Sequence, residues 1–261
     1  MLGRLFIFAA LLLTSIGTTE AQNCPDHRRI VGGVDADIKE HPWQVLLKIP
    51  TLKEGGVFCG GALVQDRWVV TAAHCFRGFN GRSVSVKSGV TKWSSGSWSE
   101  TYHVFVHGGY NGGTFENDIA LVKLASAPTG EIIPPAQSVQ QLKACQVLEV
   151  TGWGRTAEKG PTSEILQKGE VPYVENITCN AKDAYGGKIK PSMMCAGLRE
   201  GGVDSCQGDS GGPLVLRGPD GPILVGVVSW GEGCARKLRY GVYTRVSDFS
   251  HWIAQTILSN R

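Results

Sequence analysis

The sequence predicts an all-β fold made of two halves. Two sets of six short apolar or alternating runs follow one another along the chain, and clusters of Gly, Asn, Asp and Ser separate them. Short strands with turn signals between them are typical of barrels and sandwiches. The 35 glycines among 261 residues favour a turn-rich fold. Long segments with helical periodicity are few, which points away from a helical fold.

The expected strands divide evenly between the two halves. The first half holds runs at residues 43–49, 57–64, 68–75, 84–90, 102–107 and 119–124. The second half holds runs at residues 147–152, 165–174, 193–196, 213–216, 223–230 and 242–246. Six runs in each half suggest two barrels.

A helix is expected at the C-terminal end, over residues 248–258. Its apolar residues fall on one helical face, and they are Trp252, Ile253, Thr256 and Ile257. Ser247 or Asp248 could cap its N-terminus. We interpret this helix as structural.

The composition fits a globular protein with a sizeable core. Hydrophobic residues make up 42% of the chain and charged residues 19%, which suits one large domain or two small ones. The formal net charge is +3, and no run of Lys or Arg indicates a nucleic-acid partner.

The first 21 residues are predicted to be a signal peptide. Arg4 supplies the positive start, residues 5–13 are apolar, and small residues precede Ala21. The alternative is a membrane anchor, but the apolar run is shorter than the roughly 20 residues that span a bilayer. We therefore expect a secreted protein that is not bound to membranes.

Three motifs and one isolated acid point to a catalytic function. Residues 204–213 read DSCQGDSGGP, residues 71–75 read TAAHC, Asp118 opens an apolar run, and residues 29–33 read RIVGG. A Gly-rich turn is usually only a turn. In this combination, however, the chain resembles the chymotrypsin-like serine proteases of the trypsin branch, from Ile30 to Arg261. The resemblance implies two six-stranded antiparallel β-barrels with the active site in the cleft between them.

The resemblance assigns a catalytic triad. A serine hydroxyl is a weak nucleophile that needs an adjacent base, and an imidazole that titrates near neutrality suits this task. The imidazole in turn needs a carboxylate that fixes its tautomer. By resemblance, Ser210 is the nucleophile, His74 the base and then the acid, and Asp118 the orienting carboxylate. Ser229 supports that carboxylate, and the N–H groups of Gly208 and Ser210 form the oxyanion hole.

The resemblance also implies a specificity pocket for Arg or Lys. Asp204 lies six residues before Ser210, where trypsin-like members keep an acid at the pocket floor. The alternative is an aspartate in a surface loop. The other expected substrate-binding residues are Ser205, Tyr185, Ser229, Trp230, Gly231 and Gly241. Tyr240 stands where trypsins carry Pro, and members with an aromatic residue there can bind sodium nearby.

Activation by proteolysis is a further implication. Residues 22–29 would be a propeptide, and residues 30–261 the protease domain. In this family the bond equivalent to Arg29–Ile30 is cut by an activating protease. The freed amine of Ile30 would then pair with Asp209, next to the nucleophile, and complete the oxyanion hole.

Eight cysteines in a secreted chain indicate disulfides rather than zinc ligands. Eight cysteines allow 105 connectivities, so the pairing comes from the resemblance: Cys59–Cys75, Cys179–Cys195 and Cys206–Cys234. Cys24 and Cys145 remain and are expected to pair with each other. One bridge of many family members is absent, because Leu148 and Leu216 occupy its positions. We expect an apolar contact there.

Two further features of the sequence concern glycosylation and calcium binding. Asn176-Ile177-Thr178 is an N-glycosylation sequon, whose alternative is an unmodified loop. Between Phe76 and His103 the only acidic residue is Glu100, so the paired carboxylates of the calcium loop in some relatives are missing. We expect no metal and no cofactor.

The expected function is that of a secreted endopeptidase, made as a zymogen and acting as a monomer. Its partners would be protein or peptide substrates with Arg or Lys at the cleaved position, an activating protease and serine protease inhibitors. The alternative is a catalytically silent homologue that binds or regulates, but such a loss usually removes a triad residue. A digestive role and a role in a clotting or defence cascade both remain open.

Overall fold

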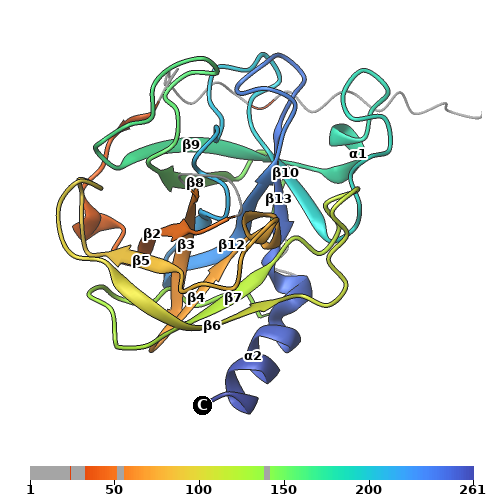
Figure 1. Ribbon diagram of the computed structural model, residues 1–261. Coiled ribbons are helices and arrows are strands. Elements are labelled where there is room, and N and C mark those ends of the chain that lie inside the picture. The colour runs from red at the N-terminus through yellow and green to blue at the C-terminus, as the bar shows by residue number, and fades with distance from the viewer. Residues whose placement is uncertain (1–23, 25–32, 52–55, 138–141) are drawn as a thin grey trace, which may run out of the picture.

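The computed structural model describes residue 24 and residues 33–51, 56–137 and 142–261. Two groups of strands form most of the molecule, and the C-terminal helix α2 (Ser250–Ser259) extends away from them (Figure 1).

The first six strands after the short β1 close into a barrel. Their order around the barrel is β2-β3-β4-β7-β6-β5, and every pairing is antiparallel. The strands are β2 (Gln44–Ile49), β3 (Val57–Gln65), β4 (Trp68–Thr71), β5 (Ser85–Ser88), β6 (Ser99–Val106) and β7 (Ala120–Leu124).

The second six strands also close on themselves. The sheet runs β9-β10-β13-β12-β11-β8, and β8 pairs with β9 to complete the ring. These strands are β8 (Val147–Gly152), β9 (Gln167–Val174), β10 (Met193–Ala196), β11 (Pro213–Gly218), β12 (Gly221–Trp230) and β13 (Gly241–Arg245). The two-residue strand β1 (Val34–Asp35) adds to the outside of β9. The prediction of two six-stranded antiparallel barrels is therefore confirmed.

The first barrel is filled by side chains that alternate along its strands. Val45, Leu47 and Ile49 of β2 are fully buried, as expected for the inward face of a strand. Gly61 of β3 faces this interior, and a Cβ built there would meet Val69 at 2.7 Å. A glycine at this position therefore leaves room for the surrounding aliphatic side chains.

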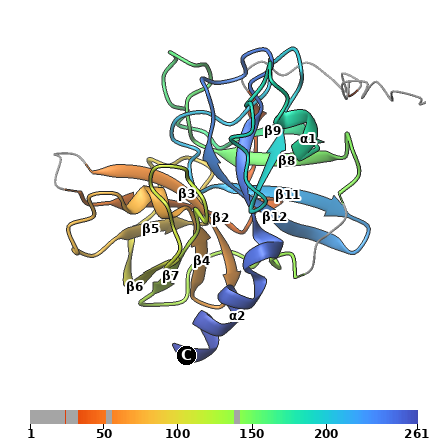
Figure 2. The ribbon, with the colours of Figure 1, turned by 90° about the vertical axis from the view of Figure 1, so that its right-hand side faces the viewer.

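The two groups of strands lie side by side, with β5 and β6 on the left and β8 and β11 on the right of Figure 2. The loop before β11 packs against β3 of the first barrel. Gly60 donates its N–H to the Ser210 carbonyl at 2.7 Å. Gly211 adopts φ +79°, and a Cβ there would come within 2.2 Å of Thr71 Oγ1. Only glycine fits this close approach. The loop that carries Ser210 is thus fixed against the first barrel.

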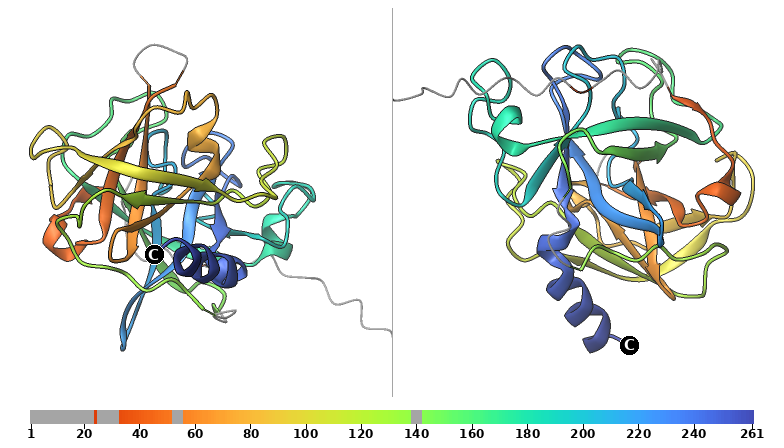
Figure 3. Two further views of the ribbon diagram at one scale, coloured as in Figure 1. Left: turned by 60° about the horizontal axis from the view of Figure 1, so that its bottom comes forward. Right: turned by 180° about the vertical axis from the view of Figure 1, so that it is seen from behind.

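The C-terminal helix joins the two barrels (Figure 3). It follows β13 of the second barrel, yet Ile253 and Ile257 are buried in the core cluster of the first barrel. These two residues belong to the predicted apolar face. The predicted caps, Ser247 and Asp248, are wrong. The 3-10 helix η3 (Val246–Phe249) runs directly into α2, so the N-cap position falls on Phe249, without a side-chain cap.

Besides η3, three short helices occur in the described loops. They are η1 (Ile38–Glu40), η2 (Ala73–Phe76) and α1 (Asn176–Cys179). Helix η2 follows β4 and carries His74. Among the described residues, no helix is both long and apolar enough to cross a bilayer.

Four disulfides link the described cysteines. They are Cys24–Cys145, Cys59–Cys75, Cys179–Cys195 and Cys206–Cys234, the pairs expected from the sequence. Leu148 and Leu216, which replace a bridge of some relatives, are buried in the same core cluster. Directly after each leucine, Glu149 and Arg217 form an ion pair at 2.8 Å. The burial of the two leucines and the Glu149–Arg217 ion pair thus stabilise the pairing of β8 with β11 in place of a disulfide.

Candidate active site

His74 and Asp118 are joined by two hydrogen bonds. His74 Nδ1 lies 2.8 Å from Asp118 Oδ2, and the backbone N–H of His74 donates to Oδ1 at 2.8 Å. Asp118 is completely buried, whereas 17% of the His74 side chain is exposed. With Nδ1 donating to the carboxylate, the imidazole presents Nε2 to the cleft as a proton acceptor.

Asp118 is held in place by the second barrel. Ser229 Oγ, on β12, donates to Asp118 Oδ2 at 2.5 Å, and Thr244 Oγ1, on β13, donates to the Asp118 carbonyl at 2.7 Å. Both hydroxyl-bearing residues are buried. Asn117, with φ +56°, turns the chain just before Asp118. The carboxylate therefore has a fixed position and satisfied oxygens.

Ser210 lies in a tight loop between β10 and β11. Asp209 N–H donates to the Cys206 carbonyl, and Gly212 N–H donates to the Asp209 carbonyl. Gly208 has φ +104°, and a Cβ there would come within 2.9 Å of the Gly154 Cα. Within the part of the chain that the structure describes, the N–H groups of Gly208 and Ser210 have no protein acceptor. Both are free to donate to an incoming oxygen.

His74 and Ser210 line one cavity of about 240 Å³. The structure shows no hydrogen bond between His74 Nε2 and Ser210 Oγ among the described residues. Such bonds are often long without substrate and shorten in the complex. The arrangement can activate a serine hydroxyl and stabilise a developing oxyanion.

Asp204 also lines this cavity. Its Oδ2 accepts the N–H of Ala235 at 3.2 Å, and its Oδ1 is buried without a partner among the described residues. Burial raises the pKa of Asp204 to about 7. A buried carboxylate with an unpaired oxygen is costly by itself. A cation that entered the cavity would relieve this cost.

Ser205, Ser229, Trp230 and Gly231 are among the other lining residues. That they bind substrate stays a prediction. Gly241 is not among the residues that line this cavity, but a Cβ built on it would come within 2.4 Å of Asp204 Oδ1.

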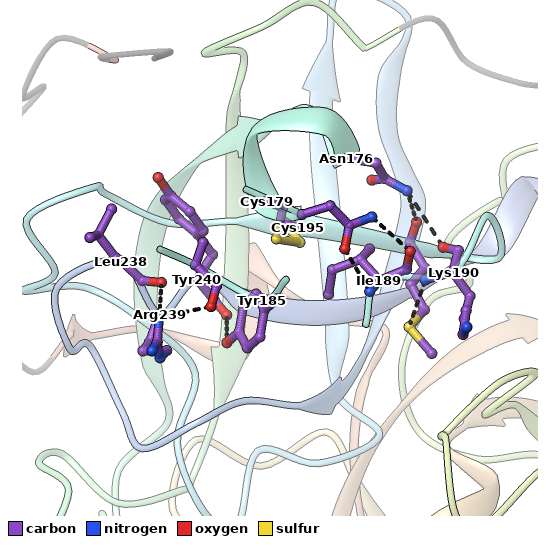
Figure 4. Close-up of a disulfide and its surroundings, with 12 residues drawn as sticks. Asn176, Cys179, Tyr185, Ile189, Lys190, Cys195, Leu238, Arg239 and Tyr240 are labelled. Atoms are coloured by element: carbon purple, nitrogen blue, oxygen red, sulfur yellow. Dashed lines mark hydrogen bonds between the residues drawn. A yellow bond between two sulfur atoms is a disulfide. The ribbon is translucent and has the colours of Figure 1, made fainter. Parts of the chain in front are cut away.

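Tyr185 does not line this cavity. It is 1% exposed, its ring packs edge-on against Trp230 at 5.1 Å, and its hydroxyl donates to the Tyr240 carbonyl at 2.6 Å (Figure 4). Arg239 fixes the backbone just before Tyr185, because its guanidinium donates to the Asp183 and Ala184 carbonyls. Tyr185 therefore braces the pocket wall from behind, next to the Cys179–Cys195 disulfide.

Sequence reasoning missed Phe115. Its ring centroid lies 5.8 Å from that of His74 and 6.4 Å from that of Trp230. On its other side, the Arg77 guanidinium carbon lies 4.7 Å from the Phe115 centroid. Phe115 adopts φ +60°, which is uncommon for an aromatic residue. No local signal in the sequence predicts this conformation.

A second cavity of about 400 Å³ lies behind the Ser210 loop. Asp209 faces it and accepts the N–H groups of Gly154 at 2.8 Å and Cys206 at 2.9 Å. Burial raises the pKa of Asp209 to about 6. Gly33 lines the same cavity. Arg29 and Ile30, a few residues earlier, lie outside the described residues.

Asn176 uses its amide within the fold. Its Nδ2 donates to the Met193 carbonyl at 3.0 Å, and its Oδ1 accepts from Arg245 at 3.3 Å. A glycan attached to Nδ2 would compete with the hydrogen bond from this nitrogen to the Met193 carbonyl of β10 (Figure 4). Glycosylation of Asn176 stays a prediction.

One cluster of possible metal ligands occurs in the described ranges, formed by Cys59, His74 and Cys75. The two sulfurs form a disulfide, so neither is the thiolate that a metal requires. This cluster does not fit a metal ion.

A serine and an imidazole that a buried carboxylate orients line one cavity of this two-barrel fold, an arrangement typical of a two-barrel serine hydrolase. The model of the trypsin family matches residues 30–253, and the chain belongs to this family. It is therefore a serine protease by descent, of the chymotrypsin-like kind, as the sequence predicted.

Two relatives extend this result. The chain is 40% identical over 233 residues to a mouse protein named transmembrane protease serine 11C, a match that covers 86% of this chain and 53% of that protein. It thus spans about half the length of that relative. It is 38% identical over 260 residues to anionic trypsin of the dog, which covers 96% of this chain and 98% of that protein.

Proposed function

We propose that the protein is a secreted endopeptidase that hydrolyses peptide bonds after Arg or Lys. The observation that carries this proposal is Asp204, which lines the same cavity as His74 and Ser210 and is a buried carboxylate with one oxygen that has no partner among the described residues. A substrate cation in this cavity would pair with the acid while its carbonyl lies at the serine. Membership of the trypsin family and the likeness to a protein named anionic trypsin support it.

The proposed reaction is acyl transfer through Ser210. Its Oγ attacks the substrate carbonyl carbon while His74 Nε2 takes the hydroxyl proton. The N–H groups of Gly208 and Ser210 stabilise the resulting oxyanion. The tetrahedral intermediate then expels the amine, which receives the proton from His74, and leaves an ester on Ser210. Water attacks this ester with His74 again as the base, releasing the acid and the free serine. Asp118 stabilises the imidazolium in each half of the reaction.

Arg suits the pocket better than Lys. A guanidinium can meet both oxygens of Asp204, whereas an ammonium on a shorter chain acts as a point charge. We expect a preference for Arg of about threefold to tenfold, on the order of 1 kcal/mol.

Activation is proposed to follow cleavage after Arg29. Residues 1–21 would be removed as a signal peptide, residues 22–29 would be the propeptide, and residues 30–261 the protease. The cavity behind the Ser210 loop contains Asp209, with Gly33 in its wall. It supports the proposal that the freed Ile30 amine enters there and pairs with Asp209. Until then, Asp209 has no cationic partner among the described residues.

The remaining partners follow from this activity. They are an activating protease that cuts after Arg29, serine protease inhibitors that occupy the Asp204 pocket, and protein or peptide substrates. The four disulfides favour secretion, because such bonds persist in oxidising compartments.

An activation assay tests the proposal. The purified precursor is cut at the Arg29–Ile30 bond, and hydrolysis of an Arg amide is measured before and after. We expect a rise of at least about 10²-fold, because the oxyanion hole is worth that much. An Asp209→Asn precursor should be cut but stay inactive, whereas Asp220→Asn, at an exposed turn, should activate normally. Full activity of the Asp209→Asn variant, or of enzyme acetylated at the Ile30 amine, would refute the activation mechanism.

A further inference from the structure

The segment 233–236, in the loop before β13, contacts the Asp204 carboxylate. The Ala235 N–H donates to Asp204 Oδ2 at 3.2 Å, and the Ala235 carbonyl accepts the Gly202 N–H at 3.0 Å. Ala235 adopts φ +55°, a left-handed conformation that is costly for a residue with a side chain. Such a backbone persists where its surroundings fix it. The position of the N–H that binds Asp204 therefore depends on the contacts of the residues beside Ala235.

The residue after Ala235 binds a carboxylate from another loop. Arg236 Nε donates to Glu158 Oε2 at 2.8 Å, and its Nη2 donates to Glu158 Oε1. Two parallel bonds make a bidentate pair, the geometry in which an Arg–carboxylate contact is strongest. The Arg236 side chain folds back over Gly233, where a Cβ would come within 2.4 Å of Arg236 Nε. The hydrogen bond from Arg236 lowers the pKa of Glu158, and the backbone N–H of Cys234 adds to this effect. Glu158 thus interacts with the residue on each side of Ala235.

Glu158 connects the loop at residues 231–240 to the loop at residues 153–166. The end of the first loop next to β13 is fixed by Tyr185, whose hydroxyl donates to the Tyr240 carbonyl at 2.6 Å (Figure 4). Among the residues that the structure describes, no backbone–backbone hydrogen bond joins the two loops. On this side, therefore, the segment 233–236 is held by the Glu158 carboxylate.

The loop that carries Glu158 also contacts the second buried acid. Glu158 and Ala235 line the cavity of about 400 Å³ behind the Ser210 loop, together with Asp204 and Asp209. Gly154, in the same loop as Glu158, donates its N–H to Asp209 Oδ1 at 2.8 Å. The loop at residues 153–166 thus binds Asp209 directly and reaches Asp204 through the segment 233–236.

We propose that Glu158 and Arg236 are positioning residues for substrate recognition. Their ion pair holds the segment 233–236 so that the Ala235 N–H keeps the Asp204 carboxylate in place for the substrate cation. This inference rests on the proposed function, in which neither residue touches the substrate. The Arg236 side chain is 59% exposed and that of Glu158 32%, and an exposed ion pair adds little to stability by itself. Its loss should therefore weaken cation binding while the protein stays folded and Ser210 stays reactive.

Amide hydrolysis and the binding of a small cation test this inference. In the activated enzyme, Glu158→Ala should raise KM on an Arg aminomethylcoumarin amide by about tenfold and leave kcat within about twofold, because binding is lost and the chemistry is kept. The Ki of benzamidine, whose amidinium needs the same carboxylate, should rise by a similar factor. Arg236→Ala should behave alike, and the double variant should lose little more, because the two residues act as one pair. Glu158→Gln keeps one acceptor oxygen and should give an intermediate KM.

Lys237→Ala is the matched control. Lys237 forms an exposed ion pair with Glu200 at 2.6 Å, in the same loop as Arg236. Backbone hydrogen bonds already join the loops of this pair, such as that from the Leu238 N–H to the Arg199 carbonyl at 2.8 Å. The KM and the benzamidine Ki of Lys237→Ala should therefore stay within about twofold of wild type.

Titration of Ser210 with a small neutral phosphonylating reagent counts the folded active sites, and Glu158→Gln serves if Glu158→Ala does not fold. Unchanged KM and Ki in the variants of Glu158 and Arg236 would overturn the inference. So would a loss confined to kcat, losses that multiply in the double variant, or an equal rise in Lys237→Ala. A wild-type enzyme that neither cleaves the Arg amide nor binds benzamidine fails earlier, because the proposed function fails with it.

Discussion

Gly241 lies so close to Asp204 that no residue with a side chain fits at position 241. A Cβ built on Gly241 would come within 2.4 Å of Asp204 Oδ1 and within 2.9 Å of the Tyr243 hydroxyl. Contacts under 3.0 Å force atoms to move. The position of the Asp204 carboxylate thus depends on having glycine, which lacks a side chain, at position 241.

The first prediction follows from this contact. Gly241→Ala should displace the Asp204 carboxylate and lower kcat/KM on Arg peptides by about 10²-fold or more, because the cation no longer reaches both oxygens. Reaction of Ser210 with a small phosphonylating reagent should change little. Gly108→Ala is the matched control, since a Cβ there meets nothing within 4 Å. Normal cleavage by Gly241→Ala would contradict the close contact.

Much of the strand pattern could be predicted because its signals are local, whereas the triad was assigned by resemblance and stays a prediction. The strand at residues 147–152 and that at residues 193–196 match the structure in both bounds. The run at residues 68–75 does not, because the chain leaves the strand after Thr71 and forms η2. This turn depends on the Asp118 carboxylate, which binds the His74 backbone from 44 residues away.

Other parts of the site depend on such long-range contacts. The left-handed backbone of Phe115 and the brace from Tyr185 to the Tyr240 carbonyl have no signal in the neighbouring sequence. The ring of Phe58 meets those of Trp93 and Trp98 across the first barrel, and sequence spacing does not reveal these contacts.

The second prediction is that His74 and Ser210 act as a unit. Ser210→Ala and His74→Ala should each lower kcat by roughly 10⁶, and the double variant should lose little more. The reason is that neither group activates the reaction without the other. Turnover by samples of known folded concentration measures this. Losses that multiply in the double variant would show that the two residues act independently.

The third prediction concerns stability and pH. Burial raises the pKa of Asp204 from 3.8 to about 7, so the folded state binds this proton more tightly than the unfolded state. The stability from the neutral form is complete below about pH 4 and is lost as pH rises through about 7. In the Ser210→Ala background, Asp204→Asn should remove this loss. The free energy of unfolding, compared with the parent, should improve by on the order of 2–4 kcal/mol between pH 4 and pH 8.

Guanidinium unfolding at both pH values measures the difference. The exposed Asp220→Asn variant should show no comparable gain. An Asp204→Asn variant whose stability follows the parent at both pH values would mean that Asp204 is hydrated in the folded protein.

The fourth prediction is that the propeptide stays attached after activation. Cys24 is bonded to Cys145, on the other side of the proposed cut at Arg29. The intact mass of the activated protein should therefore fall by the mass of the propeptide only after the disulfides are reduced. Mass spectrometry with and without reductant measures this. Release of the propeptide without reductant would mean that the Cys24–Cys145 bond does not form in the purified protein.

The most direct test of the account compares Arg, Lys, Phe and Leu at the cleaved position for the wild type and Asp204→Ser. The activated wild type should cleave after Arg and then Lys. Removing one partner of a buried ion pair costs on the order of 3–5 kcal/mol. Asp204→Ser should therefore lower kcat/KM on Arg peptides by roughly 10²–10⁴ while Ser210 still reacts with a small acylating reagent. Efficient wild-type cleavage after Phe or Leu, or an Asp204→Ser variant that cleaves Arg peptides normally, would contradict the account.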